Sequence, residues 1–375
     1  MTKIGINAQL LSSQAGYRSA GIHNVLHQTL THLPKISPDD WQFTAMVGSE
    51  NHAEYPSIRM KRASLNTESP AKRILWEQLI QPFELGDYDL YHAGAFVAPF
   101  ILPVPMVVTV YDLTFMRYPE RLTPARRVYL KTLTALTCKR AKRIIAISES
   151  TKQDIVDLLE ISADKVDVTP LAYDSNVLKP LPKSAIENFK LKQGLPERFW
   201  LYLGTIEPRK NLVTLIEAYA RLPQSERLPL VLAGGKGWLT EPIFEAIERH
   251  NLSDSIHLPG FIPTDDLTLW YNSAELFIFP SIFEGFGLPV LEAMACGTPI
   301  MTTNVSSLPE VAQDAGMSLA PDDITAWVEA LQKAYHDRDW REQASQRGIE
   351  IAQTFTWEET ARLTLASYQR ALQEK

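Results

Sequence analysis

Two glutamates eight residues apart mark the stretch of the chain best suited to chemistry. It reads PSIFEGFGLPVLEAMACG from Pro280 to Gly297 and holds Glu284 and Glu292. An apolar, strand-like run ends at Pro280, Pro289 suits the first turn of a helix, and Gly297 suits the C-terminal cap of that helix. We therefore expect Glu284 on a loop and Glu292 in the first turn of the following helix.

The glycines beside Glu284 indicate what this loop could bind. Gly285 and Gly287 would let backbone N–H groups approach a ligand closely, next to the positive end of the helix. A phosphate suits such a position, and free carboxylates suit the hydroxyls of a sugar or a ribose. Two carboxylates are also typical of a glycoside hydrolase, although their spacing in sequence does not define their separation in space. The simplest alternative is a strand–helix connection with solvated acids.

A pair of adjacent cations forms the second motif, GTIEPRKN, in which Arg209 and Lys210 precede a predicted helix at 211–222. Cations at the N-terminus of a helix are unfavourable by about 0.3–1 kcal/mol each, because the helix dipole is positive there. An anion bound between them would reverse that sign, since Arg grips an anion through two donors and Lys acts as a point charge. Two exposed cations on a loop are the alternative. Together the two motifs predict a site for a negatively charged, sugar-bearing ligand.

The elements that must position these motifs are short β-branched runs alternating with longer helical patterns. The predicted strands are 3–8, 43–47, 90–92, 107–111, 143–147 and 166–170 in a first half, and 199–204, 228–233, 255–258, 276–280 and 299–303 in a second. The predicted helices include 124–141, 211–222, 242–250, 264–273, 289–295 and 355–375, the last opening on a capping box at Thr356. This alternation predicts doubly wound parallel sheets that bind ligands beyond the carboxyl ends of their strands. The segment 173–197, rich in proline, is the predicted linker between two domains.

The composition suits a chain with large apolar cores. Of 375 residues, 45% are hydrophobic and 22% are charged, which excludes a disordered or collagen-like chain. The net charge of −7 argues against a nucleic-acid binder, which needs a basic face. Cys138 and Cys296, the two cysteines, cannot make a disulfide framework or a cysteine-based zinc site, and we expect a reducing compartment.

The N-terminus, MTKIGINAQLL, has neither the long apolar region nor the cleavage site of a signal peptide. The uncharged stretch 90–111 approaches the length of a membrane span, but Pro99, Pro103 and Pro105 break it. We therefore expect a cytoplasmic protein without a transmembrane helix.

The order of the motifs resembles that of retaining GT-B glycosyltransferases of family 4. The resemblance is carried by EGFGLPVLE, by GTIEPRKN, by the run LPGFIPTDDLTLWYNSAELFIFPS before Glu284 and by TNVSSLPEV after Glu292. The closest likeness is to bacterial mannosyltransferase-like enzymes of surface polysaccharide synthesis. The resemblance implies an α/β fold of the GT-B type, with two facing doubly wound Rossmann-like domains, parallel sheets and an interdomain cleft. Residues 1–172 with a C-terminal helix at 357–375 would form the acceptor-side domain, and 173–356 the donor-binding domain.

The resemblance also implies roles for single residues. Arg209 and Lys210 would hold the diphosphate of a nucleotide-sugar donor, Glu292 would bind the ribose hydroxyls, and Glu284 would hold the donor sugar. The backbone groups implied in donor binding are those of Phe286, Gly287 and Leu288 for the sugar, Phe261 and Ile262 for the base, and the loop 16–21, ending at Gly21, for the phosphates and the acceptor.

One departure concerns the first domain. Many members of the family carry a His-Asp pair after the fourth strand, whereas this chain has Tyr111 and Asp112 there. A neutral Tyr donates a hydrogen bond but is a poor base near pH 7. Transfer in the family is described as front-face attack in which the departing phosphate helps to deprotonate the acceptor. The resemblance then implies that the His is a polar contact and not an obligatory base, so that its replacement by Tyr111 need not abolish activity, and Tyr111 and Asp112 are candidate catalytic residues. His92 could supply an imidazole nearby, or could be a core residue.

The site so predicted needs no metal and no cofactor, since the nucleotide sugar is a substrate. Two cations and a helix terminus can stabilise the leaving nucleoside diphosphate as its charge develops. The D-x-D at 87–89 is interpreted as structural, because such triplets are common by chance. The glycine-rich segment 234–237 could approach a nucleotide, but a tight turn explains it equally well.

A basic window runs from 121 to 143, with eight Lys or Arg residues and no acids. A solvated helix face is one interpretation. The other is a peripheral contact with anionic lipid at the inner face of the membrane, where a lipid-linked acceptor would lie. The leading hypothesis is a metal-independent, retaining hexosyltransferase that moves a hexose, with mannose favoured, to a glycan or lipid-linked acceptor. The alternatives are a nonhydrolysing nucleotide-sugar epimerase and an inactive homologue acting as a scaffold.

Overall fold

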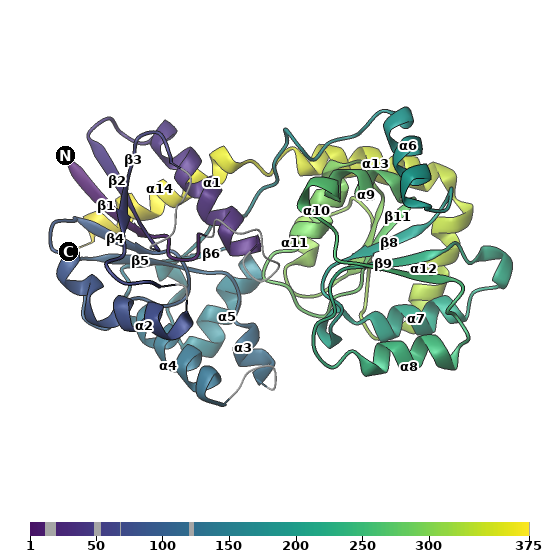
Figure 1. The fold of residues 1–375 in the computed structure, drawn as a ribbon, viewed down its shortest axis with the longest axis horizontal. Coiled ribbons are helices and arrows are strands. Elements are labelled where there is room, and N and C mark those ends of the chain that lie inside the picture. Colours follow the sequence, from purple (N-terminus) through teal and green to yellow (C-terminus); the bar gives the residue numbers. More distant parts are fainter. Residues whose placement is uncertain (12–19, 49–53, 68, 120–123, 375) are drawn as a thin grey trace. The chain divides into compact units, whose positions relative to one another are not determined.

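The computed structural model describes residues 1–11, 20–48, 54–67, 69–119 and 124–374, which form two compact units (Figure 1). Unit 1 consists of Met1–Leu171 with Thr356–Lys375, and unit 2 of Ala172–Phe355. Each unit is built around one parallel β-sheet covered by helices, as the alternation of strands and helices predicts.

Unit 1 holds a seven-stranded sheet in the order β3-β2-β1-β4-β5-β6-β7. Its strands are β1 Thr2–Asn7, β2 Trp41–Val47, β3 Ile58–Arg62, β4 Leu90–Ala93, β5 Met106–Val110, β6 Arg143–Ala146 and β7 Val166–Val168. Its helices are α1 Ala20–Ile36, α2 Pro70–Leu79, α3 Thr114–Arg117, α4 Pro124–Arg140, α5 Glu149–Leu159 and α14 Trp357–Gln373, with short 3₁₀ turns at Gln81–Glu84 (η1) and Ala163–Lys165 (η3). The strands β4, β5 and β6 are buried along their whole length, because helices cover both faces of a parallel sheet.

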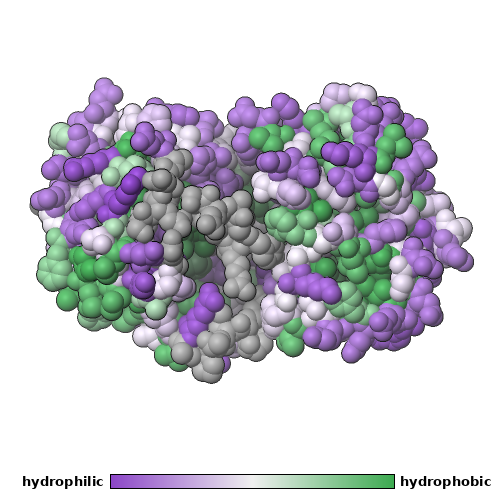
Figure 2. Space-filling view, in the orientation of Figure 1, coloured by the Kyte–Doolittle hydropathy of each residue, from purple (hydrophilic) through white to green (hydrophobic). Residues whose placement is uncertain are grey.

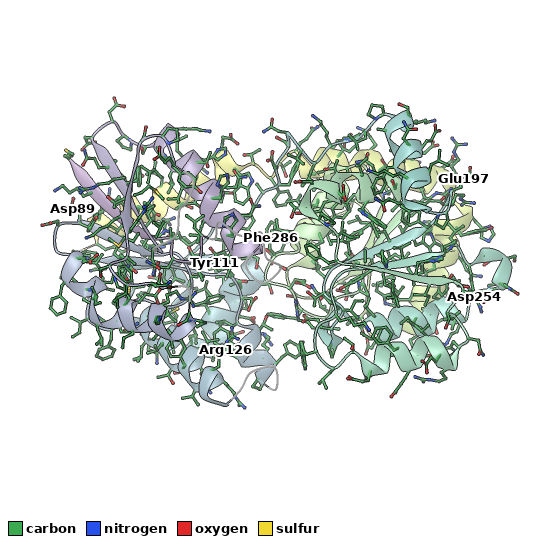
Figure 3. The ribbon with its side chains drawn as sticks, in the orientation of Figure 1. Asp89, Tyr111, Arg126, Glu197, Asp254 and Phe286 are labelled. Carbon is green, nitrogen blue, oxygen red and sulfur yellow. The ribbon has the colours of Figure 1, made fainter. Side chains whose placement is uncertain are left out.

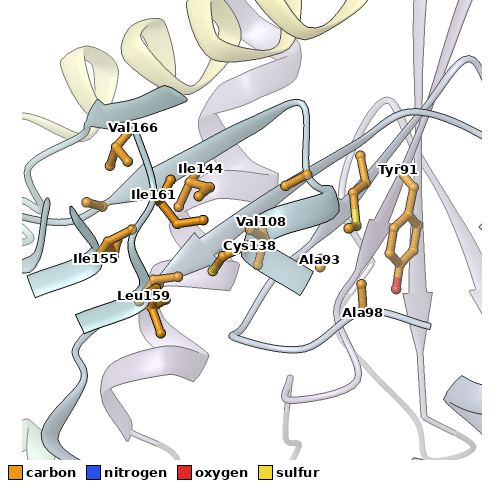
Figure 4. Close-up of a cluster of buried hydrophobic side chains, with 14 of the residues drawn as sticks. Tyr91, Ala93, Ala98, Val108, Cys138, Ile144, Ile155, Leu159, Ile161 and Val166 are labelled. Carbon is orange, nitrogen blue, oxygen red and sulfur yellow. The ribbon is translucent and has the colours of Figure 1, made fainter. Parts of the chain in front are cut away.

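Two apolar clusters form the core of unit 1, one on each side of this sheet. Figure 4 shows the cluster in which Tyr91, Val108 and Ile144 of the strands meet Cys138 of α4 and Ile155 of α5. The other cluster joins the opposite side chains of the strands to α1 and α14.

The C-terminal helix α14 belongs to unit 1, where it packs beside α1 (Figure 1). The hydroxyl of Thr356 accepts a hydrogen bond from the backbone N–H of Glu359 at 3.2 Å, which confirms the predicted N-terminal cap. Farther along, Tyr368 of α14 bonds to Nδ1 of His92 in β4 at 2.6 Å.

Unit 2 holds a six-stranded sheet in the order β10-β9-β8-β11-β12-β13. Its strands are β8 Trp200–Leu203, β9 Leu230–Ala233, β10 Ile256–Gly260, β11 Leu276–Phe279, β12 Ile300–Thr303 and β13 Met317–Leu319. Its helices are α6 Lys183–Gln193, α7 Leu212–Ala220, α8 Glu241–Arg249, α9 Leu267–Ser273, α10 Leu288–Ala295, α11 Leu308–Ala312, α12 Ile324–His336 and α13 Arg338–Ala352. Three 3₁₀ turns lie at Pro208–Lys210 (η4), Gln224–Glu226 (η5) and Thr264–Asp266 (η6).

Both sheets reverse their strand order at one point. In unit 1 the reversal falls between β1 and β4, and in unit 2 it falls between β8 and β11. Loops leaving the two strands beside such a reversal run to opposite sides of the sheet, so a crevice opens where ligands of doubly wound folds bind. The cation motif follows β8 and the first glutamate follows β11, so the sequence motifs stand at the reversal of unit 2.

The observed elements differ from the predicted ones in three places. The strands β3 and β13 are additional to the predicted ones; β3 lies at a sheet edge with a charged, half-exposed sequence, and β13 has only three residues. The predicted linker 173–197 contains the helix α6, whose Phe189 packs against Trp270 of α9. The boundary between the two units lies just before this segment, between Leu171 and Ala172.

In the described parts of the chain, none of the helices combines the length and apolar composition needed to cross a bilayer.

Candidate functional site

The loops that follow β8 and β11 are joined to each other by hydrogen bonds. After β8 the chain forms the 3₁₀ turn Pro208–Lys210, and Asn211, with φ of 54°, leads into α7. The backbone carbonyl of Arg209 accepts hydrogen bonds from the N–H of Ile282 at 2.9 Å and from the hydroxyl of Ser281 at 3.2 Å. The cation motif and the glutamate loop therefore form one site at the reversal of the unit 2 sheet.

The predicted cations are paired with the first glutamate. Nζ of Lys210 lies 2.5 Å from Oε1 of Glu284, and NH1 of Arg209 lies 2.7 Å from Oε2. The side chains of Lys210, Arg209 and Glu284 are only 7%, 15% and 13% exposed. The carboxylate of Glu284 is thus paired within the chain, because the order of the strands brings it beside the two cations.

The ionisation of this cluster follows from its contacts. Burial alone would raise the pKa of Glu284, but Arg209 and Lys210 outweigh it and lower that pKa to about 2. Burial also lowers the pKa of the Lys210 ammonium, and Glu284 opposes that shift. The ammonium of Lys210 lies 4.7 Å from the centre of the Phe279 ring, which adds a cation–π contact on its apolar side.

The loop that carries Glu284 is held from a third segment, which follows β12. The hydroxyl of Ser306 accepts from the backbone N–H of Glu284 at 3.1 Å, and the hydroxyl of Ser307 donates to the carbonyls of Glu284 and Phe286 at 2.9 and 2.8 Å. Sequence reasoning assigned no role to these serines or to Ser281. The TNVSSLPEV run contains Ser306 and Ser307, and its resemblance to the family is the signal in sequence that could have indicated them.

The helix α10 starts at the same loop. Gly287 precedes the helix with φ of 109°, a conformation that favours glycine, and no side chain caps the helix there. Pro289 has no N–H, and the N–H groups of Val290 and Leu291 donate to the carbonyl of Gly287 at 3.0 and 3.3 Å. The N–H of Leu288, at the first helical position, is therefore the donor in this turn that suits an anion or a polar oxygen. Figure 3 labels the buried Phe286 beside it. Pro289 in the first turn and Gly297 after the last residue, with φ of 75°, lie where the sequence predicts them.

The second glutamate lies in the second turn of α10, not in the first turn as expected, because the helix starts at Leu288. The carboxylate of Glu292 accepts a hydrogen bond from the hydroxyl of Tyr271 in α9 at 2.8 Å. Burial raises the pKa of Glu292, and the bond from Tyr271 opposes that shift. Tyr271 was not among the predicted site residues, and a lone tyrosine on a helix carries no signal for such a contact.

The segment proposed for the nucleotide base follows β10. Phe261 is 57% exposed, whereas Ile262 is buried. The glycine-rich segment 234–237 lies between this segment and β8. Gly234 N–H donates to the carbonyl of Gly260 at 2.7 Å, and a Cβ on Gly234 would lie 1.8 Å from the carbonyl oxygen of Gly204. These contacts explain the glycine at 234 by the close approach of its backbone to Gly204 and Gly260.

The remaining predicted residues lie in unit 1. Tyr111, labelled in Figure 3, follows β5 and donates its hydroxyl to the carbonyl of Gly94 at 3.0 Å, and burial raises its pKa. Asp112 accepts from the N–H of Thr114 at 2.8 Å, at the start of α3. Gly21 lies in the first turn of α1, while 16–19 of the predicted loop fall outside the described residues.

His92 is a core residue. Its Nε2 lies 2.8 Å from the hydroxyl of Thr109, its Nδ1 bonds to Tyr368, and burial lowers its pKa to about 3. The imidazole is therefore neutral, with both ring nitrogens engaged within the core of unit 1.

One acid of the D-x-D at 87–89 has a structural contact. Asp89 of the D-x-D, labelled in Figure 3, accepts from the backbone N–H of Lys3 at 2.8 Å. No group of three or more His, Cys, Asp or Glu in the described ranges is arranged to hold a metal ion.

The basic residues of the window 121–143 do not all lie on the surface. Arg143 is buried and ion-paired with Asp167, so it belongs to the core of unit 1. The residues of the basic window that are described and exposed on α4 are Arg126, Arg127, Lys131, Lys139 and Arg140. Arg121 lies outside the described residues.

Comparisons with known proteins identify the family. Residues 184–351 match the family model described as Glycosyl transferases group 1, and residues 21–177 match the one described as Glycosyltransferase Family 4. The chain is 35% identical over 292 residues to the O-antigen chain mannosyltransferase B of Escherichia coli, covering 77% of this chain and 76% of that one.

Solved structures show the fold. Sucrose-phosphate synthase of Thermosynechococcus elongatus matches with a TM-score of 0.77 at 21% identity over 98% of both chains. HepE of Anabaena in complex with UDP and glucose matches with a TM-score of 0.75 at 19% identity, over 98% of this chain and 100% of that one. The expected α/β fold of the GT-B type, with two Rossmann-like units, is confirmed. With both family models matched and a mannosyltransferase relative covered over three quarters of its length, the chain belongs to the family-4 glycosyltransferases.

Proposed function

We propose that the chain is a retaining hexosyltransferase that moves a hexose, with mannose favoured, from a nucleoside diphosphate sugar to a glycan or lipid-linked acceptor in surface polysaccharide synthesis. The observation that carries the proposal is the pair Arg209 and Lys210, held on Glu284 at the reversal of the unit 2 sheet. The O-antigen mannosyltransferase relative supports mannose, and the complex of HepE with UDP and glucose supports a nucleotide-linked donor.

The chemistry proposed for this cluster is an exchange of anions. The diphosphate of the donor takes the place of the Glu284 carboxylate on Arg209 and Lys210, and the released carboxylate then accepts hydrogen bonds from hydroxyls of the donor sugar. As the bond to the sugar breaks, negative charge grows on the diphosphate, where two cations and the start of α10 stabilise it without a metal. The departing phosphate accepts the proton of the attacking acceptor hydroxyl. Glu292 binds the ribose, Ile262 borders the base, and Gly21, Tyr111 and Asp112 belong to the acceptor side.

Thermal-shift measurements with UDP and GDP test the donor class, because a ligand that binds the folded state raises its stability by mass action. One of the two should raise the melting temperature. Transfer from the matching hexose donor, followed by NMR, should give a product that keeps the anomeric configuration of the donor, and EDTA should leave the rate unchanged. Failure of both nucleotides to bind would instead favour an inactive scaffold. Conversion of the donor alone to its epimer would identify an epimerase.

We also propose that unit 1 contacts anionic membrane from the cytoplasm, through α4 and the surface next to it. Besides the cations of α4, this surface exposes large apolar side chains where a soluble face normally carries polar ones. They are Leu75, Leu79 and Phe83 on or after α2, and Phe100 and Ile101 on the loop before β5. Figure 2 shows hydrophobic residues gathered in this region of unit 1, and Figure 3 labels Arg126 of α4.

Contacts with Phe100 join the three segments into one surface. Gln78 of α2 accepts from the N–H of Phe100 at 2.8 Å. The guanidinium of Arg140 in α4 donates to the carbonyl of Phe100 and lies 5.6 Å from the centre of its ring. The apolar side chains would enter the interface while the cations meet anionic headgroups.

Sedimentation with vesicles tests this contact. The protein should bind vesicles of phosphatidylcholine with phosphatidylglycerol and not vesicles of phosphatidylcholine alone. A Phe100→Ser, Ile101→Ser variant should lose binding. Leu191→Ser is the matched control, since Leu191 is 81% exposed in unit 2. Equal loss in the control, or no binding of the wild type, would contradict the proposed surface.

A further inference from the structure

The guanidinium of Arg209 lies between two carboxylates. Its Nε and NH2 bond to Oε1 of Glu207 at 3.1 and 3.0 Å, while its NH1 lies 2.7 Å from Oε2 of Glu284. The side chain of Glu207 is 13% exposed, as little as that of Glu284. The two acids therefore occupy different edges of one cation, and only one of these edges has to be vacated for a ligand to reach it.

Glu207 is fixed by a loop on its other side. Its Oε2 accepts a hydrogen bond from the indole Nε1 of Trp238 at 3.2 Å. The backbone on either side of this contact is paired as well, since Ile206 N–H donates to the carbonyl of Gly235 at 3.0 Å and Gly237 N–H donates to the carbonyl of Ile206 at 2.9 Å. A Cβ at Gly237 would lie 2.7 Å from the carbonyl oxygen of Ile206, so this close approach requires glycine.

We propose that Glu207 is a positioning residue for the donor diphosphate. It holds the Nε and NH2 edge of Arg209, braced by Trp238, so that NH1 stays aimed at the position now taken by Glu284 when the diphosphate replaces that carboxylate. This inference rests on the proposed donor binding by Arg209. Glu207 itself touches no part of the donor.

A positioning role and a simple charge effect predict opposite changes in diphosphate affinity when Glu207 loses its charge. Glu207 is an anion beside the proposed diphosphate site, so its charge repels the ligand. If that were its only effect, Glu207→Gln would strengthen diphosphate binding. If Glu207 orients Arg209, the same substitution weakens binding, because the charge-assisted bonds that fix the guanidinium become ordinary ones.

The experiment is calorimetric titration of the full chain with UDP, UMP, GDP and GMP. For whichever diphosphate the wild type binds, Glu207→Gln should weaken binding about tenfold, the scale of one charge-assisted hydrogen bond. The affinity for the corresponding monophosphate, which lacks the terminal phosphate, should change much less. Trp238→Phe should shift diphosphate binding in the same direction by less. Glu217→Gln is the matched control, because Glu217 is paired with Arg249 and His250 elsewhere in unit 2.

A coupling measurement separates positioning from general damage. In an Arg209→Ala background, Glu207→Gln should cause no further loss of diphosphate binding. Equal or tighter diphosphate binding by Glu207→Gln would overturn the proposal, as would an equal loss for the mono- and diphosphate. A wild type that binds diphosphate while Arg209→Ala binds it equally well would refute the proposed donor site itself, and the role of Glu207 with it.

Discussion

Lys210 and Glu284, 74 residues apart in the chain, form an ion pair of 2.5 Å at the reversal of the unit 2 sheet. The pair closes the connection between the loop after β8 and the loop after β11, and Ser281 bonds to the same carboxylate oxygen at 2.5 Å. A buried pair of this kind costs desolvation on both sides, so it is weak evidence for stability. The proposed exchange, in which a diphosphate replaces Glu284 on Arg209 and Lys210, would give the pair a function.

Lys210→Met should destabilise unit 2 by about 2 kcal/mol, because the carboxylate of Glu284 loses one of its two cations in a buried position while Arg209 remains. Adding Glu284→Gln should recover part of that loss, since no buried anion is then left short of a partner. Urea unfolding of the two single variants and the double variant measures the coupling. Strict additivity would show that the pair contributes nothing as a pair.

Glu292→Ala should weaken nucleoside diphosphate binding by ten- to a hundredfold, about the scale of a charge-assisted hydrogen bond from a ribose hydroxyl. The same variant should bind the 2′,3′-dideoxy nucleotide as well as the wild type does, since that ligand has no ribose hydroxyl to lose. Tyr271→Phe, which removes the competing donor to Glu292, is the control and should not weaken binding. An equal loss of affinity for the ordinary and the dideoxy nucleotide would show that Glu292 does not bind the ribose hydroxyls.

The stability of unit 1 should fall as the pH drops below about 6.5. His92 has its pKa lowered to about 3 by burial, so between pH 6.5 and 3 the unfolded chain binds a proton that the folded one does not. The loss is about 1.4 kcal/mol for each pH unit in that window. The comparison is the melting temperature of the wild type and His92→Gln between pH 6.5 and 5, above the range in which most carboxylates titrate. Equal slopes would contradict a buried neutral imidazole.

Tyr111→Phe should leave the rate of sugar transfer within a few-fold of the wild-type rate. The hydroxyl donates to the carbonyl of Gly94, and its raised pKa keeps it protonated, so it cannot accept a proton from the acceptor. The lost hydrogen bond should destabilise unit 1 by about 0.5–1.5 kcal/mol. Steady-state transfer rates and urea unfolding measure the two effects. A hundredfold loss of transfer with unchanged stability would show that the hydroxyl takes part in the reaction.

The ends of two helices were predictable because their signals are local. Pro289 marks the start of α10 and Gly297 marks its end, and the capping pattern at Thr356 marks the start of α14. The elements that were not predicted depend on tertiary contacts. The alternating apolar and basic residues of Ile58–Arg62 form a strand because they pair with the edge of β2. The helix Lys183–Gln193 is stabilised by the packing of Phe189 against Trp270.

The cluster could be predicted by residue type but not by its contacts. Two cations after one strand and a glutamate after another indicate an anion site, yet the pairing of Lys210 with Glu284 requires that β8 and β11 be neighbours. Glu207 stands in the same motif as Arg209, but neither its bonds to that arginine nor the contact with Trp238 has a signature in sequence.

The measurement that tests the proposed function most directly is hexose transfer by the purified wild type, Lys210→Ala and Glu292→Ala, with donor binding followed in parallel. We predict that the wild type binds one nucleoside diphosphate tightly and transfers the matching hexose, and that both variants remain folded but lose transfer. Retained transfer in both variants would contradict the assignment of the site to these residues.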